Sequence, residues 1–77
     1  MQVTLLAFAS AAQTLGWRER QVAAEPSDTP RTLLGRVAPG FDPAQARAAV
    51  NCEYHDWDAV IRDTAREVAI IPPVSGG

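Results

Sequence analysis

The chain ends in an apolar segment that two consecutive prolines cut short. Its last residues read EVAIIPPVSGG, and the apolar, β-branched composition of residues 67–71 favours a strand. Ile71 precedes a proline and is biased towards extended backbone, while Pro72 and Pro73 donate no backbone hydrogen bonds, so the strand must end there. A final strand of this kind needs a sheet that the earlier residues build around it.

The start of the chain has the same character. The segment QVTLLAFA, residues 2–9, is rich in β-forming residues and alternates between two sets of positions, which predicts a strand. One set is Val3, Leu5 and Ala7, and the other is Thr4, Leu6 and Phe8. Residues 10–16 can form one helical turn that Gly16 stops, and RQVAAE at residues 20–25 is typical of a second strand. The two strands are expected to pair as an antiparallel hairpin.

One helix is expected within PSDTPRTLLGRVAPG, residues 26–40. The candidate N-caps are Ser27, Asp28 and Thr29. Pro30 is tolerated in the first turn, and the APG sequence ends the helix. Three apolar side chains fall on one side of it, Leu33, Leu34 and Val37. That side needs a sheet to cover it. Gly35 within the helix costs about 1 kcal/mol relative to alanine, so the helix depends on this packing.

The rest of the chain completes the order of elements. Residues 41–50 are expected to form a short turn and a strand, and residues 51–71 a turn, a loop and the final strand. Strand, strand, helix and strands fit an α+β domain in which one main helix packs across a mixed sheet. The β-grasp fold of ubiquitin-like proteins has this order. We predict a β-grasp domain at residues 1–71 and a projecting C-terminal tail at residues 72–77.

Composition excludes several classes of protein. Seventy-seven residues support one small domain, which buries about 60% of the surface of its unfolded chain. The formal net charge of -2 argues against a nucleic-acid partner, and no apolar run reaches the roughly 18 residues of a membrane span. The single cysteine, Cys52, excludes an intramolecular disulfide and a multi-cysteine zinc site, which favours a reducing, cytoplasmic location. We do not expect its thiol to be reactive.

The body of the chain offers no convincing catalyst. His55 lies close to Asp56 and Asp58, a set that suits a metal site or an acid–base pair but is more often a solvated turn. Trp17 and Trp57 can stack a ligand, although in so small a domain they are expected to cap the edges of the core. We therefore expect no metal site and no bound cofactor.

The C-terminal tail carries the candidate chemistry instead. Its residues are Pro72, Pro73, Val74, Ser75, Gly76 and Gly77. Extended, they reach about 20 Å, which is enough to enter another protein's active site. Gly76 and Gly77 lack Cβ atoms, so an enzyme can approach the terminal carbonyl without a clash. A free carboxylate is a poor electrophile and must first be activated, for example as an acyl-adenylate. The alternative is a flexible Ser-Gly-Gly terminus without a role.

The sequence resembles the small subunit of molybdopterin synthase, the MoaD family of ubiquitin-like sulfur carriers. The resemblance covers nearly the whole chain, from VTLLAFASAAQTLG through RQVAAE, TPRTLL and AAVN to EVAIIPPVSGG. The ending is its most specific part. A hydrophobic strand followed by PPVSGG is typical of that family, whereas many ubiquitin-like proteins end in Gly-Gly.

The resemblance implies a role in molybdenum cofactor biosynthesis. An E1-like adenylating enzyme (MoeB-like) uses ATP to activate Gly77, and a sulfur donor, a cysteine desulfurase or rhodanese-type protein, converts it to a thiocarboxylate. The tail then enters the large subunit of molybdopterin synthase (MoaE-like), where sulfur passes to cyclic pyranopterin monophosphate. The chain is then a non-catalytic, sulfur-carrying subunit, and most catalytic groups belong to the partner.

The alternation of the strands predicts where such partners dock. If Val3, Leu5 and Ala7 face the helix, Leu6 and Phe8 lie on the other face, and in the last strand Val68 and Ile70 lie inside while Ala69 and Ile71 lie outside. An exposed apolar patch is then expected beside the tail, made of Leu6, Phe8, Tyr54 and Ile71. The resemblance implies that this face docks both the activating enzyme and the large subunit.

Two alternatives remain open. In the first, the chain is a related carrier that feeds sulfur to another pathway, such as that of thiamine or cysteine, through the same thiocarboxylate. A ubiquitin-like modifier instead forms isopeptide bonds with lysines of other proteins. All seven basic residues of this chain are arginines, which excludes lysine-linked chains of the protein itself but not its attachment to targets.

Overall fold

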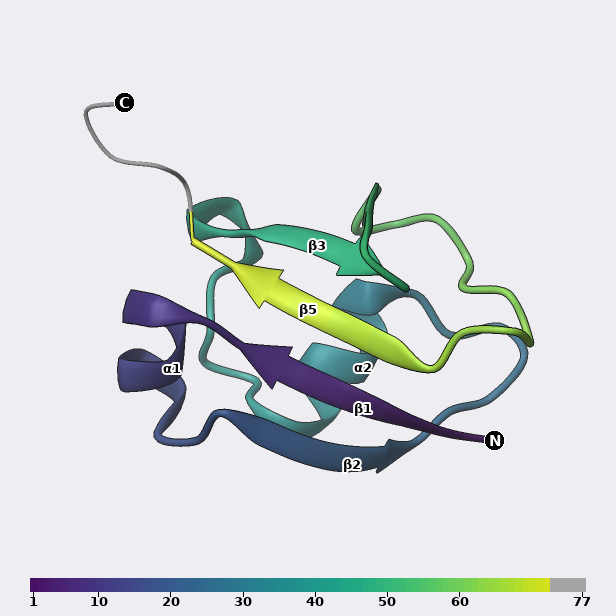
Figure 1. Ribbon diagram of the computed structural model, residues 1–77, viewed down its shortest axis with the longest axis horizontal. Helices are drawn as coiled ribbons and strands as arrows, with labels where there is room; N and C mark the ends of the chain where they lie inside the picture. The colour runs from purple at the N-terminus through teal and green to yellow at the C-terminus, as the bar shows by residue number, and fades with distance from the viewer. Residues whose placement is uncertain (73–77) are drawn as a thin grey trace.

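The computed structural model describes residues 1–72, which form five strands, two α-helices and one 3-10 helix (Figure 1). The strands are β1 (Gln2–Ala7), β2 (Glu19–Ala23), β3 (Arg47–Val50), β4 (Glu53–His55) and β5 (Glu67–Ile71). The helices are α1 (Ala9–Leu15), α2 (Pro30–Val37) and the 3-10 helix η1 (Pro43–Gln45).

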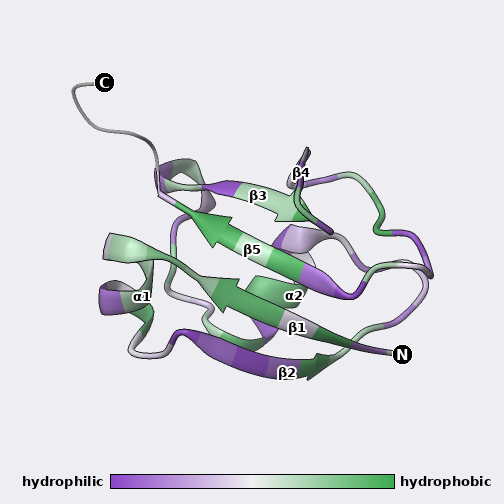
Figure 2. Ribbon diagram, viewed as in Figure 1, coloured by the Kyte–Doolittle hydropathy of each residue, from purple (hydrophilic) through white to green (hydrophobic). Residues whose placement is uncertain are grey.

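The strands form one mixed sheet in the order β2-β1-β5-β3-β4. The first and last strands of the chain, β1 and β5, pair in parallel at the centre, with Leu5 opposite Val68. The other three pairs are antiparallel. Figure 2 shows that the two central strands are largely hydrophobic, whereas the edge strand β2 is mostly hydrophilic. The predicted mixed β-grasp sheet is therefore confirmed.

The core lies between one face of this sheet and α2 (Figure 1). Its largest fully buried side chains come from β1, α2 and β5: Val3, Leu5, Pro30, Leu33, Leu34, Val68 and Ile70. Each buried Leu or Ile contributes roughly 1.5–3 kcal/mol. The inward sets predicted for the first and last strands are confirmed, as is the apolar side of the helix.

Local signals fix the start of α2. Thr29 is its N-cap, and the Thr29 hydroxyl accepts a hydrogen bond from the backbone N–H of Thr32 at 3.2 Å. The Thr32 hydroxyl in turn accepts one from the N–H of Thr29 at 2.8 Å. Pro30 occupies the first turn, where its missing N–H costs nothing. Of the three candidate caps, Thr29 is the one used.

The connection between β1 and β2 is longer than a hairpin turn. The predicted single turn at residues 10–16 is a seven-residue helix, Ala9–Leu15, which Gly16 ends at a φ of 87°. Its Ala11 is buried and its Leu15 packs against the core, and this tertiary contact extends the helix beyond one turn. The two strands still pair antiparallel, with β2 at 19–23 rather than 20–25.

Trp17 and Trp57 both lie at the margin of the core. Each is partly buried and packs against the core cluster, and the indole N–H of Trp57 donates to the carbonyl oxygen of Ala46 at 3.2 Å. The prediction that these residues cap the edges of the core is confirmed.

Candidate docking surface

The strand pairing arranges the face of the sheet turned away from α2, which we call the outer face, in rows. Residues paired across neighbouring strands lie on the same face. The root row, where β5 leads into the C-terminal segment, contains Phe8, Ile71 and Arg47. The middle row contains Glu19, Leu6, Ala69, Ala49 and Tyr54. The far row contains Gln21, Thr4 and Glu67.

A groove of about 430 Å³ occupies the centre of the outer face. Its lining is mainly apolar and consists of Leu6, Phe8, Ala49, Cys52, Tyr54, Glu67, Ala69 and Ile71. Ala49 and Ala69 are paired across β3 and β5, and their methyl groups leave space that larger residues would fill. Phe8 and Tyr54 stand beside this floor with 47% and 65% of their surface exposed. The result is an apolar hollow between two exposed aromatic rings.

An arginine borders this hollow at the root row. The guanidinium carbon of Arg47 lies 4.1 Å from the centre of the Tyr54 ring, which is a cation–π arrangement. Arg47 is paired with Ile71, the last residue of β5. A positive charge is therefore held next to the residue from which the C-terminal segment leaves the sheet.

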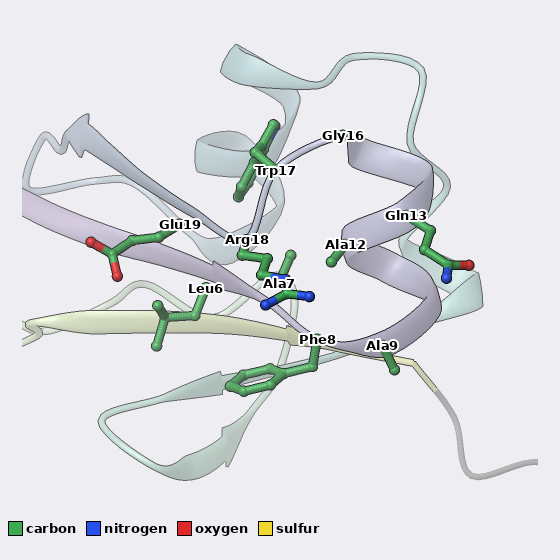
Figure 3. A pocket seen from close by; sticks show the side chains of 10 residues that line it. All are labelled: Leu6, Ala7, Phe8, Ala9, Ala12, Gln13, Gly16, Trp17, Arg18 and Glu19. Carbon is green, nitrogen blue, oxygen red and sulfur yellow. The ribbon is translucent and has the colours of Figure 1, made fainter.

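A second hollow of about 660 Å³ lies on the other side of Leu6 and Phe8. It is lined by α1 and the start of β2, and Figure 3 shows the side chains of Arg18 and Gln13 around it. Phe8 thus stands between an apolar hollow and a more polar one. Ala9, directly after Phe8, has a φ of 48°, so the chain turns sharply from β1 into α1 at this point.

The structure brings together the four residues predicted to form the patch. Leu6, Phe8, Tyr54 and Ile71 all line the apolar groove, and their role in binding a partner stays a prediction. Of the predicted tail, Pro72 is described and half-buried. Pro73, Val74, Ser75, Gly76 and Gly77 lie outside the described residues.

The residues considered as alternative sites occupy ordinary surroundings. His55 Nε2 lies 3.0 Å from the carbonyl oxygen of Ala59. Asp58 accepts a 2.7 Å hydrogen bond from Arg31 Nε, which lowers the pKa of the Asp58 carboxyl below its usual value. Within residues 1–72, no three histidine, cysteine or acidic side chains gather as metal ligands would. Cys52 is exposed at the far end of the groove.

Sequence reasoning missed the alanine floor and the arginine of the outer face. Ala49 and Ala69 are small, and their adjacency depends on pairing between segments twenty residues apart, which no local pattern reveals. Arg47 lies two positions before Ala49 in β3, so the two side chains share a face. This spacing is the one sequence signal that places Arg47 on the outer face.

Comparison with known families decides the relationship. Residues 5–77 match the ThiS family. The matched segment includes both the domain and the C-terminal Gly-Gly. The chain belongs to the ThiS family. It is thus a ubiquitin-like sulfur carrier of the ThiS/MoaD type, and the resemblance stated from the sequence is confirmed at that level.

Solved structures share the fold of this ThiS-family chain. SAMP1 from Haloferax volcanii superposes with a TM-score of 0.75 at 22% identity, covering 100% of both chains. A Pyrococcus furiosus protein described as molybdopterin converting factor, subunit 1, gives 0.73 at 24% identity, covering 96% of this chain and 99% of that one. A complex of subunits 1 and 2 of molybdopterin-converting factor from Helicobacter pylori gives 0.64 at 17% identity with complete coverage of both chains. At such identities the likeness shows the fold alone.

Two further observations are negative. The search of curated protein sequences gave no match to this ThiS-family chain. In the part of the chain that the structure describes, none of the helices has the length and apolar character needed to cross a membrane.

Proposed function

We propose that this protein is the sulfur-carrying small subunit of molybdopterin synthase. The observation that carries the proposal is the apolar groove of the outer face, which reaches Ile71 at the point where the PPVSGG segment begins. A partner that covers this groove receives the C-terminal segment at the same time. The Helicobacter pylori neighbour is a subunit 1 bound to a subunit 2, which supports a two-subunit arrangement.

In this proposal Gly77 is the carrier residue. An E1-like enzyme joins AMP from ATP to the carboxylate of Gly77 and releases pyrophosphate. The persulfide of a sulfur donor then displaces AMP to form an acyl disulfide, and a thiol reductant cleaves the S–S bond to leave the thiocarboxylate. Within the large subunit, the thiocarboxylate gives up its sulfur to cyclic pyranopterin monophosphate, and the carboxylate is regenerated with an oxygen from water. The body of the chain supplies docking and delivery.

A modifier role is the second candidate, and one observation favours it. SAMP1, which superposes along its full length, is named a small archaeal modifier protein. A modifier uses the same adenylated Gly77 but passes the acyl group to a lysine amine, which releases AMP and forms an isopeptide bond. The two roles differ in the group that attacks the activated carbonyl of Gly77. Protein purified from its own host tests both roles.

The deciding experiment is intact-mass analysis of the protein purified from its own host. A carrier shows a C-terminus in which one oxygen is replaced by sulfur, and this species converts cyclic pyranopterin monophosphate to molybdopterin when the large subunit is added. Conjugates that join Gly77 to lysines of other proteins, without any sulfur-bearing form, would support the modifier role. A sulfur-bearing form that the large subunit cannot discharge would assign the carrier to another pathway.

A further inference from the structure

The charges of the outer face have opposite signs at its two ends. Arg47 lies in the root row beside Ile71, whereas Glu67 lies in the far row beside Thr4. Glu67 and Ile71 are four residues apart on one strand, or about 13 Å at 3.3 Å per residue. Glu19, paired with Leu6 in the middle row, lines the other hollow and not the groove. The apolar groove therefore runs from a positive end at the root row to a negative end.

Arg47 is held in place and has no carboxylate partner among residues 1–72. Its contact with Tyr54 restrains the guanidinium over the ring. The ion pairs among residues 1–72 are Arg31 with Asp58 and Arg36 with Asp28, and neither involves Arg47. A restrained, unneutralised guanidinium loses little conformational entropy when it binds a planar anion such as a carboxylate.

Arg18 places a second cation near the root row. Its side chain lines the hollow on the α1 side of Phe8, as Figure 3 shows. Arg18 is likewise absent from the ion pairs of the described residues. The exposed ring of Phe8 therefore stands between two arginines that no carboxylate of residues 1–72 neutralises.

We infer that the partner surface covering the outer face is polarised in the opposite sense, with a carboxylate facing Arg47 and a basic group facing Glu67. This inference rests on the proposed function, in which the partner is the large synthase subunit. Apolar contact alone permits the groove to be covered in either direction. The two charged ends fix one direction, and that direction carries the C-terminal segment into the reaction centre of the partner.

A second copy of this chain would also offer charges of both signs if it lay antiparallel on the outer face. Such a dimer would cover Ile71, the root of the segment that the proposed function requires to be accessible. We therefore assign the face to the large subunit, and sedimentation of the protein alone tests the other possibility. A dimer that Arg47→Glu dissociates would overturn the inference.

The test is the association rate constant with the purified large subunit, measured in low salt and in about 0.5 M salt. Arg47→Glu is expected to slow association about tenfold in low salt, and Glu67→Arg to slow it by a smaller factor. Both effects should shrink at high salt, where screening is strong. Arg47→Lys keeps the charge and should retain most of the rate. Circular dichroism confirms that each variant is folded.

The matched control is Arg20→Glu, which changes the net charge as Arg47→Glu does. Arg20 is paired with Leu5 and so faces the helix side of the sheet. We expect it to alter the rate by less than about twofold. Equal slowing by Arg20→Glu and Arg47→Glu would show that only net charge matters and would overturn the inference. If the wild-type chain does not bind the large subunit at all, both the proposed function and the inference are wrong. If it binds and transfers sulfur but the charge substitutions have no position-dependent effect, only the inference is wrong.

Discussion

Arg36 donates to both carboxylate oxygens of Asp28, over distances of 3.1 and 2.8 Å. Asp28 is buried and accepts further hydrogen bonds from the backbone N–H of Glu25 and the hydroxyl of Thr32. Together these contacts join the loop that follows β2 to both the first and the last turn of α2. The hydrogen bond from Arg36 is the main reason that the pKa of Asp28 falls from its ordinary 3.8 to about 2.

Acid should therefore weaken the fold through Asp28. Because its folded pKa is lower than its unfolded pKa, the stabilisation is complete above about pH 4 and is lost as the pH falls towards 2. It amounts to about 2 kcal/mol at neutral pH. Asp28→Asn is expected to lose this stability and the corresponding pH dependence in urea titrations, whereas the exposed Asp63→Asn should change neither. Equal stability of wild type and Asp28→Asn at pH 7 would contradict the prediction.

Cys52 is expected to be a poor residue for its turn. Asn51 and Cys52 form the two-residue connection between β3 and β4, with φ values of 49° and 71°. This conformation favours Asn-Gly, since a side chain at the second position is strained. Cys52→Gly should stabilise the protein by about 0.5–1 kcal/mol, the relief of left-handed strain less the greater unfolded-chain entropy of glycine, seen as a higher midpoint of thermal unfolding. Cys52→Ala keeps the Cβ atom and is the control; a similar gain in both variants would rule out relief of the turn as the cause.

Much of the fold follows from short-range patterns. Alternation in residues 2–9 and 67–71 predicted the inward and outward sets of β1 and β5, and the cap of α2 was among the three candidates. The extent of α1 was not predicted, because it depends on the packing of Ala11 and Leu15 against the core. The three-residue β4 was likewise too short to recognise. β4 pairs with β3, and the turn between them is tied to the start of β5 by Asn51, whose side-chain oxygen accepts from the N–H groups of Arg66 and Glu67.

The candidate site likewise contains some residues that local patterns predict and others that they do not. Leu6, Phe8 and Ile71 were placed correctly on the outer face because each follows from the period of its own strand. The Arg47–Tyr54 contact and the alanine floor come from pairing between separate segments, and the register of that pairing is set by tertiary packing.

His55 and Cys52 are predicted to have no part in sulfur transfer. His55, the last residue of β4, contacts a backbone carbonyl of the loop that follows it, and Cys52 lies at the far end of the groove from Ile71. His55→Ala and Cys52→Ala should therefore transfer sulfur from a thiocarboxylate at the wild-type rate in single-turnover assays. Unfolding curves measured in parallel separate any loss of stability. A large loss of rate in a stably folded variant would assign chemistry to the body of the chain.

Deleting Gly77 should abolish sulfur loading and leave the fold unchanged. The core residues of the described part end at Ile70, so removing the last residue takes nothing from that core. Mass spectrometry after incubation with the activating enzyme, ATP and a sulfur donor measures loading, and thermal unfolding measures stability. A truncated chain that still acquires sulfur would rule out Gly77 as the carrier residue.

The last prediction concerns the exposed ring of Phe8 as an anchor for the large subunit. Burial of such a side chain is worth roughly 1.5–3 kcal/mol, and about 1.4 kcal/mol corresponds to a tenfold change in affinity. Phe8→Asp should thus raise the dissociation constant at least tenfold in a calorimetric titration against the purified large subunit. Val60→Asp is the matched control, because Val60 is similarly exposed, 54% against 47%, but does not line the groove. Wild-type affinity in a folded Phe8→Asp variant, or an equal loss in both variants, would show that the outer face is not where the large subunit docks.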